Sequence, residues 1–239
     1  MDEKKLHPQI TLEVVLFALY EQRLCLLLIK RESAPFLDAW SLPLGEIDLV
    51  QDQCLEDSAK RKLKTLLGVD IPYLEQVQTV GNENRDPRGW SVSIAYYGLL
   101  SCDEITNFPE RQSRSKRGEA RWVPIDEAMK NPLAFDHQRI IENCLQRFQN
   151  KSLYTSLPIF LLPTEFTLTE LQKCYEAILG FKIEKKSFRR RLLDAGFLQE
   201  TGNIRRASHR PALLYRLAHQ QPYFFPRIIE GVRDSRHPV

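Results

Sequence analysis

The stretch Gly45–Val69, GEIDLVQDQCLEDSAKRKLKTLLGV, constrains the fold of this chain more than any other segment. Its apolar side chains recur at spacings of three and four residues, which predicts an amphipathic helix packed against a core. Asp52 is the expected N-cap, and Glu56 falls in the first turn. Gly68 suits the left-handed position just beyond a helix. The segment therefore predicts a loop, a helix and a second loop.

Strand-forming runs surround this helix. Thr11–Leu19 and Leu24–Ile29 are leucine-rich or β-branched, and a polar turn separates them, so a hairpin is expected. The other elements expected in the first part of the chain are strands near Leu74–Val80, Ser91–Leu100 and Glu119–Pro124 and a helix at about His137–Phe148. These elements together predict an α+β fold.

The net charge of +3 is unevenly spread along the 239 residues. Residues 151–239 hold 15 Lys/Arg against 8 Asp/Glu, a net charge of +7, whereas residues 1–150 have a net charge of −4. An acidic first part and a basic second part predict two domains, 1–150 and 151–239, and indicate that the second meets a polyanion.

Cysteine usage and hydropathy favour a cytoplasmic protein. The five cysteines are scattered and form no Cys-x-x-Cys pair, which argues against a zinc site and favours a reducing compartment. No apolar run approaches the ~18 residues of a membrane span. The charged N-terminus, MDEKKLHPQ, is followed by no signal-peptide pattern. We therefore expect no association with a membrane.

The pattern after residue 150 is helix, turn, helix and hairpin. Helices are expected at Glu170–Leu179 and Ser187–Ala195, each closed by a glycine. This order predicts a winged helix-turn-helix, whose second helix enters the major groove of DNA while arginines of the wing contact phosphates. A solvated helix face is the commoner fate of a basic cluster, but a second basic cluster follows on the hairpin. The candidate DNA-binding residues are Thr167, Thr169, Lys185, Lys186, Ser187, Arg189, Arg190, Arg191, Arg205, Arg206, His209 and Arg210.

The polar loop GNENRDPRGW, residues 81–90, collects side chains suited to a nucleotide. Arg85 and Arg88 suit phosphate groups. Asp86 suits ribose hydroxyls, and Trp90 suits stacking on a base. On composition alone, a solvated hairpin loop with internal Arg–Asp pairs is an equally good interpretation.

The helical stretch resembles the Nudix box, which runs Gly, five residues, Glu, seven residues, Arg-Glu, two residues, Glu-Glu, one residue, Gly. Nudix hydrolases hold Mg²⁺ with these glutamates, and Mg²⁺ requires oxygen ligands. When the last glycine is placed at Gly68, the four glutamate positions hold Gln53, Lys62, Thr65 and Leu66. The frame of the motif is present without its carboxylates. This predicts a domain that holds no metal and is not an enzyme, although a basic helix can attract phosphate.

A degenerate Nudix segment followed by a basic winged helix resembles the Nudix-related transcriptional regulators of NAD metabolism (the NrtR type). The resemblance covers nearly the whole chain, including KR at 30–31, WSLP at 40–43, LAFDH at 133–137 and FTLTEL at 166–171. It implies an N-terminal Nudix-like α/β/α sandwich with a mixed sheet and a C-terminal winged helix-turn-helix.

In that family the Nudix domain senses an effector, typically ADP-ribose, and the winged helices of a homodimer bind a palindromic operator near NAD-biosynthesis genes. The resemblance thus implies a repressor that binds double-stranded DNA, needs no cofactor and responds to ADP-ribose or a related nucleotide. The candidate effector-binding residues are Arg31, Trp40, Arg61, Arg85, Asp86, Arg88 and Trp90.

Two hypotheses of other classes stay open. The first is a metal-dependent Nudix hydrolase of a nucleoside diphosphate derivative with a basic accessory domain. It requires carboxylates that the box positions lack, although Glu46, Asp48, Asp52, Glu56 or Asp57 could supply makeshift ligands. The second is an RNA-binding accessory protein, because a basic winged helix alone does not distinguish the two nucleic acids.

Overall fold

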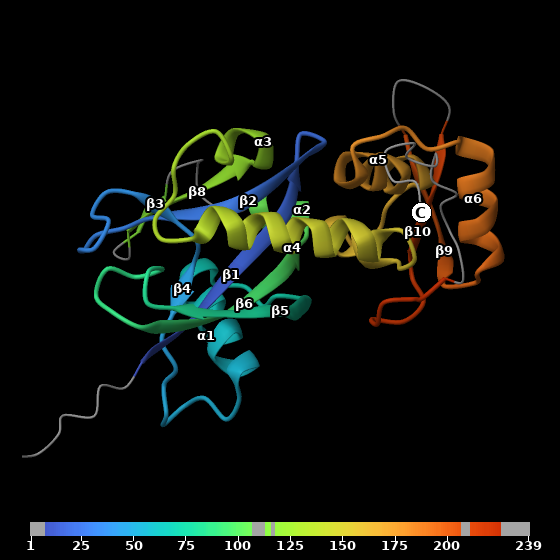
Figure 1. Cartoon of the computed structure of the whole chain (residues 1–239). Coiled ribbons are helices and arrows are strands. Elements are labelled where there is room, and N and C mark those ends of the chain that lie inside the picture. Colours follow the sequence, from blue (N-terminus) through green and yellow to red (C-terminus); the bar gives the residue numbers. More distant parts are fainter. Residues whose placement is uncertain (1–7, 107–112, 116–117, 207–210, 226–239) are drawn as a thin grey trace, which may run out of the picture. The chain divides into compact units, whose positions relative to one another are not determined.

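The computed structural model describes residues 8–106, 113–115, 118–206 and 211–225 (Figure 1). The chain divides into two compact units, Met1–Arg147 and Phe148–Val239. Within the described ranges, no helix combines the length and the apolar character that crossing a bilayer requires.

An eight-stranded mixed sheet forms the first unit. Its order is β5-β6-β1-β2-β8-β7, with β3 beside β2 and β4 beside β1. The strands are β1 (Gln9–Tyr20), β2 (Arg23–Lys30), β3 (Trp40–Ser41), β4 (Leu44–Gly45), β5 (Tyr73–Asn82), β6 (Ser91–Leu100), β7 (Ser113–Ser115) and β8 (Gly118–Pro124). Because β1 runs parallel to β6 and antiparallel to β2 and β4, the sheet is mixed, as the resemblance implied.

The predicted hairpin is confirmed as β1 and β2. Glu21 and Gln22 connect the two strands, and both have positive φ angles, 47° and 63°. Two left-handed residues give a two-residue turn the twist that matches the flanking strands.

The two faces of β1 pack against different helices. The side chains of Leu12, Val14, Leu16 and Ala18 enter one core cluster with Ala59 and Leu63 of helix α1 (Leu55–Leu67). Successive side chains of a strand point to opposite faces, so the odd-numbered residues, among them Glu13, face the other side of the sheet. There Glu13 lies beside the first residue of helix α4 (His137–Ser152). Helices on both faces make the unit an α/β/α sandwich.

Helix α1 is the helix predicted from the box segment, with one correction at its start. Its N-cap is Cys54, and Asp52 lies outside the helix. The prediction that Asp52 caps the helix was wrong, because both of its carboxylate oxygens accept charge-assisted hydrogen bonds from Arg61. At the other end Gly68 has a φ of 79°, which confirms the predicted left-handed termination.

The remaining helices of the first unit are short, apart from α4. Helices α2 (Cys102–Thr106) and α3 (Ile125–Ala128) were not predicted, because one turn shows no apolar periodicity. Helix α4 begins at the predicted residue and continues four residues past the expected end, to Ser152.

The second unit has the predicted helix, turn, helix and hairpin. Its elements are the 3-10 helix η1 (Leu157–Leu161), α5 (Leu168–Leu179), α6 (Lys185–Asp194), β9 (Leu198–Arg205) and β10 (Ala212–Leu217). Strand β9 pairs antiparallel with β10 and extends four residues beyond the predicted end at Thr201. Phe188 and Leu192 of α6 are buried, and the Phe188 ring meets the Tyr175 ring of α5 edge-on at 5.1 Å.

Candidate functional site

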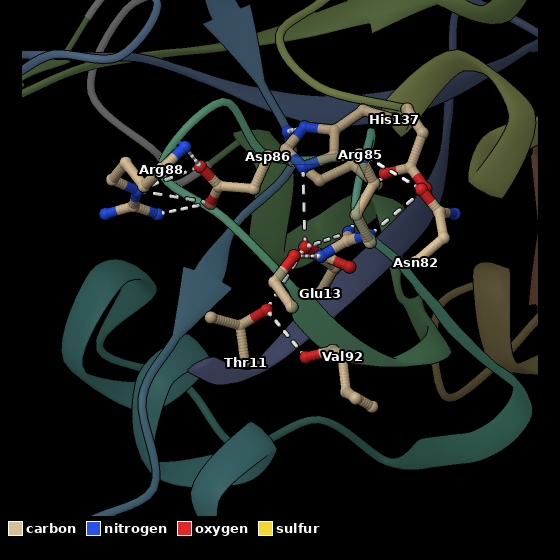
Figure 2. Close-up of polar contacts among 11 residues, drawn as sticks. Thr11, Glu13, Asn82, Arg85, Asp86, Arg88, Val92 and His137 are labelled. Atoms are coloured by element: carbon tan, nitrogen blue, oxygen red, sulfur yellow. Dashed lines mark hydrogen bonds and ion pairs between the residues drawn. The ribbon is translucent and has the colours of Figure 1, made fainter. Parts of the chain in front are cut away.

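A buried ionic network lies beneath the loop at residues 83–90. Arg85 Nη2 lies 3.0 Å from Glu13 Oε1 and 2.9 Å from Asp136 Oδ1, and the Arg85 and Glu13 side chains are 3% and 2% exposed. Burial works against the charge of Arg85, but the hydrogen bonds that it donates to Asp136 and the charge of Glu13 leave its pKa raised. Figure 2 shows Arg85 pointing toward Glu13 and away from Asp86 and Arg88. The network joins β1, the loop and the start of α4.

His137 completes this network without offering a binding site. Its Nδ1 accepts a hydrogen bond from the Leu42 backbone N–H at 3.0 Å. A neutral ring with Nδ1 as acceptor carries its proton on Nε2, which lies 3.6 Å from Glu13 Oε1. The side chain is fully buried, so His137 ties α4 to the segment after β3.

Arg85 therefore departs from its expected role in phosphate binding. Its guanidinium is buried and engaged by carboxylates, so a phosphate would have to displace Glu13 or Asp136 to reach it. We correct its assignment from effector ligand to support of the loop. The Asn82 side chain holds the start of that loop, accepting hydrogen bonds from the backbone N–H groups of Asn84 and Arg85, both at 2.9 Å.

Arg88 pairs with Asp86 within the loop, and the charges of both act on the guanidinium of Arg31. Arg88 donates to both oxygens of Asp86, with Nη2 2.6 Å from Oδ2. These hydrogen bonds lower the pKa of Asp86 and raise that of Arg88. Burial, followed by the charge of Arg88, lowers the pKa of Arg31. A guanidinium group whose charge is disfavoured by burial and by a second guanidinium nearby marks a surface suited to an anion.

Aromatic side chains border this surface. The Arg31 guanidinium lies 4.7 Å from the centre of the Phe135 ring, and the Phe36 ring meets Phe135 at 4.8 Å. Both phenylalanines have positive φ angles, 62° and 54°, a conformation that costs energy for bulky residues and is common at functional sites. Neither was predicted as a site residue, since only the surrounding backbone brings them together.

The two predicted tryptophans lie in different surroundings. One face of the Trp40 ring is covered by the Arg121 guanidinium at 3.8 Å. Trp90 is 54% exposed and lies over Gly81, where an added Cβ would approach its ring to 3.2 Å. Trp90 therefore has the freer aromatic surface of the two.

A second group of charges occupies the position of the box. Arg61 Nε and Nη2 each lie 2.7 Å from a carboxylate oxygen of Asp52, and Ser58 Oγ donates to the same carboxylate. The hydrogen bonds from Arg61 hold the pKa of Asp52 far below its usual range. Beside this pair is an open pocket of about 720 Å³, lined by Glu46, Ile47, Asp48, Leu49, Arg61 and Lys62.

These residues do not fit a divalent cation. Lys62, which the sequence pattern assigns to the first helical glutamate position of the box, is a partly buried cation. The makeshift acids have other partners: Asp52 is paired with Arg61, Glu56 with Lys60 at 2.6 Å, and Asp48 with the backbone N–H groups of Val50 and Gln51. In the described part of the chain, no group of three or more His, Cys, Asp or Glu side chains is placed to hold a metal ion.

Glu46 links the two groups of charges. The pKa of Arg88 is raised mainly by its hydrogen bonds to Asp86 and further by the charge of Glu46. The pKa of Lys62 is lowered by burial and by Arg61, and the charge of Glu46 opposes this shift. Arg61 and Lys62 line the pocket with Glu46, and the charge of Glu46 also acts on Arg88, which pairs with Asp86. Lys62 and Glu46 were not among the effector-binding residues predicted from the sequence. A lysine at a motif position that usually holds a carboxylate was the available indication.

In the second unit, α6 presents a cationic face opposite its buried face. Phe188 and Leu192 are buried and lie one turn apart on the same side of the helix. Lys186 lies two positions before Phe188, and Arg190 lies two positions before Leu192, so both cations are on the opposite, exposed side. The Glu184 carboxylate caps the helix and accepts hydrogen bonds from the backbone N–H groups of Lys186 and Ser187. The helix therefore begins two residues earlier than predicted.

Several predicted DNA-binding residues have partners within the unit. Thr167 is the buried N-cap of α5 and forms a capping box with Glu170, so its assignment as a DNA contact is corrected to a structural one. Arg205 is engaged by Glu170 and by the backbone carbonyl of Glu165. Arg189 Nη2 donates to Thr169 Oγ1 at 2.7 Å, beside a pocket between α5, α6 and β10.

The other predicted DNA-binding residues differ in exposure. Four are exposed: Lys185, Lys186, Arg190 and Arg206. Two are partly buried, Ser187 and Arg191, and two lie outside the described residues, His209 and Arg210.

Two family models match the chain. The NUDIX domain model covers residues 10–144, and the model of the NrtR DNA-binding winged helix domain covers residues 158–217.

Individual proteins are similar to the chain, two of them over nearly its whole length. The ADPR responsive transcriptional repressor NtrR of Acinetobacter baylyi is 45% identical over 95% of this chain and 89% of its own length. Shewanella oneidensis NrtR complexed with a 27mer DNA is 40% identical, with a TM-score of 0.85 over 92% of this chain and 99% of that one. The NUDIX domain of the same protein, complexed with ADP ribose, is 37% identical, with a TM-score of 0.53 over 62% of this chain and 94% of its own. With both domains matched in this order, the chain belongs to the NrtR family of Nudix-related transcriptional regulators.

Proposed function

We propose that this chain is a transcriptional repressor whose Nudix unit binds ADP-ribose, or a close relative of it, and whose winged helix binds operator DNA. The observation that carries this proposal is the 45% identity, over 95% of the chain, to an ADPR responsive transcriptional repressor. The genes it controls are those of NAD metabolism, and a protein that acts on the chromosome works in the cytoplasm.

The charge distribution of the Nudix unit supports a nucleotide effector. Arg31, Arg61 and Arg88 supply guanidinium groups for a diphosphate, and Asp86, the partner of Arg88, accepts hydrogen bonds from ribose hydroxyls. Charge-assisted hydrogen bonds of this kind contribute roughly 1.5–3 kcal/mol each. Trp90 and the Phe36–Phe135 pair offer apolar surface for a base.

A homodimer is the oligomeric form that this function requires. One winged helix reads few base pairs, and two copies related by a two-fold axis read an inverted repeat. The centres of the half-sites are then about one helical turn apart, roughly 34–36 Å, or a multiple of it.

The test of the repressor function is a DNA titration of the full chain. Fluorescence anisotropy with an inverted-repeat operator from the chain's own upstream region should show tight binding, and ADP-ribose should change the affinity, because coupled sites shift each other's equilibria. Equal affinity for a scrambled duplex, or no effect of ADP-ribose, NAD and other nucleoside diphosphates, would contradict the proposal.

We predict that the protein does not hydrolyse ADP-ribose at an enzymatic rate. A bound metal activates water and offsets phosphate charge in such reactions, and the box positions hold Lys62 and neutral side chains in place of carboxylates. Purified protein incubated with ADP-ribose and Mg²⁺ should release no AMP above the rate without protein. Robust release that is lost on Glu56→Gln would favour the hydrolase hypothesis instead.

A further inference from the structure

Lys62 has surroundings unlike those of the other lysines on α1. The ammonium groups of Lys60 and Lys64 are exposed and paired with Glu56 and Asp70, at 2.6 and 2.8 Å. Lys62 is partly buried and lies over Gly45, whose added Cβ would come within 3.5 Å of the lysine Cβ and Cγ. It lines the open pocket beside β4 and α1.

The charges around Lys62 leave it poorly compensated. Burial is the largest effect that lowers its pKa, the adjacent Arg61 adds to it, and Glu46 opposes it. Glu46 is itself shared, since its charge also acts on Arg88. Asp48 lines the same pocket but is hydrogen-bonded to backbone N–H groups and to Gln51. An ammonium group held partly out of water beside a guanidinium favours the arrival of an anion.

We propose that the ammonium group of Lys62 binds the diphosphate of the effector in place of a divalent metal ion, so that effector binding does not require Mg²⁺. The inference rests on the proposed function and adds to it a ligand residue and an independence from Mg²⁺. The pocket wall supplies further positive charge through Arg61, and Glu46 of the same pocket lies near enough to Arg88 for its charge to raise the pKa of that guanidinium. Lysine is a compact point charge with three donors, which suits it to phosphate oxygens.

The experiment is calorimetry of the full chain with ADP-ribose, in EDTA and then in Mg²⁺. The wild-type affinity should be the same in both buffers. Lys62→Gln should lower it by about 10- to 100-fold, the range expected for one charge-assisted contact. Lys64→Gln is the matched control on the same helix and should bind like the wild type. Lys62→Glu should bind more weakly still, with part of the affinity restored by Mg²⁺.

The pH dependence separates a contact with the ligand from a structural role. The pKa of Lys62 is lowered in the free protein, so its charge is lost at a lower pH than that of an ordinary lysine. ADP-ribose affinity should therefore fall as the pH rises through that pKa, and Lys62→Arg, which stays charged, should remove the fall. Thermal unfolding of Lys62→Gln should show no loss of stability, because the substitution removes a partly buried charge.

The failures are distinguishable. Wild-type binding that requires Mg²⁺, or that Lys62→Gln leaves unchanged, would overturn this inference while the effector function stands. No heat with ADP-ribose in either buffer would overturn both.

Discussion

Replacing Arg85 with alanine should destabilise the Nudix unit by about 3–5 kcal/mol, the range observed when one partner of a buried ion pair is removed. The cause is Glu13, whose carboxylate is almost fully buried and would lose its guanidinium partner. Glu13 Oε2 already has no hydrogen-bond partner among the described residues. Urea unfolding followed by circular dichroism measures the change.

Two further variants make this result interpretable. Arg23→Ala removes an exposed arginine that is paired with Asp126 and Glu127, and it should change the free energy of unfolding little, because water screens such pairs. Adding Glu13→Gln to Arg85→Ala should recover part of the lost stability, because the uncompensated charge is then gone. If Arg85→Ala were as stable as Arg23→Ala, the buried network would not be a support of the fold.

The second large effect is expected on DNA binding. Arg190→Ala should lower operator affinity and also flatten sequence preference, because an arginine bidentate to guanine contributes about 1–3 kcal/mol of discrimination. Arg190 is exposed and lies on the side of α6 opposite Phe188 and Leu192.

Arg206 lies just beyond β9. Arg206→Ala should lower the affinity for all DNA sequences alike and reduce the slope of log affinity against log salt by about one.

The measurement is a binding titration at several salt concentrations with an operator and a scrambled duplex. Lys182→Ala is a suitable control, because Lys182 is a surface cation of the same unit, bound to Glu176 at 2.9 Å. Discrimination by Arg190→Ala equal to that of the wild type would exclude this side chain from base recognition. Loss of discrimination in Arg206→Ala would reverse the two assignments.

The parts of the fold that periodicity determines were predictable. The hairpin of β1 and β2, the helix of the box segment and the strand Ser91–Leu100 follow from local apolar patterns and were found where expected. Helix ends were less accurate, because capping is a competition among nearby polar groups. At α1, Asp52 is bound by Arg61, and Cys54 is the N-cap residue instead. The local sequence does not determine which of these partners Asp52 takes.

The site was predictable by residue type and less so by role. Arg88 and Arg61 were selected for their charge; Arg88 pairs with Asp86, and Arg61 lines the open pocket. Arg85 was selected for the same reason, but its partner Glu13 stands 72 residues away in the sequence. Glu13 is a charged residue inside an otherwise apolar strand, which indicates that a buried cation pairs with it. Which cation did so depends on long-range packing.

The parallel pairing of β1 with β6 has a consequence for the order in which the chain folds. Partners such as Gln9 and Ser91, or Ala18 and Leu100, are about eighty residues apart, and such distant pairings slow folding. The strands of the β9–β10 hairpin pair residues that are close in sequence, such as Arg205 with Ala212. During synthesis, the central strand β1 is made first but must wait for β6 to leave the ribosome. The β9–β10 hairpin, by contrast, pairs residues that are synthesised close together, so it can form without waiting for a distant strand.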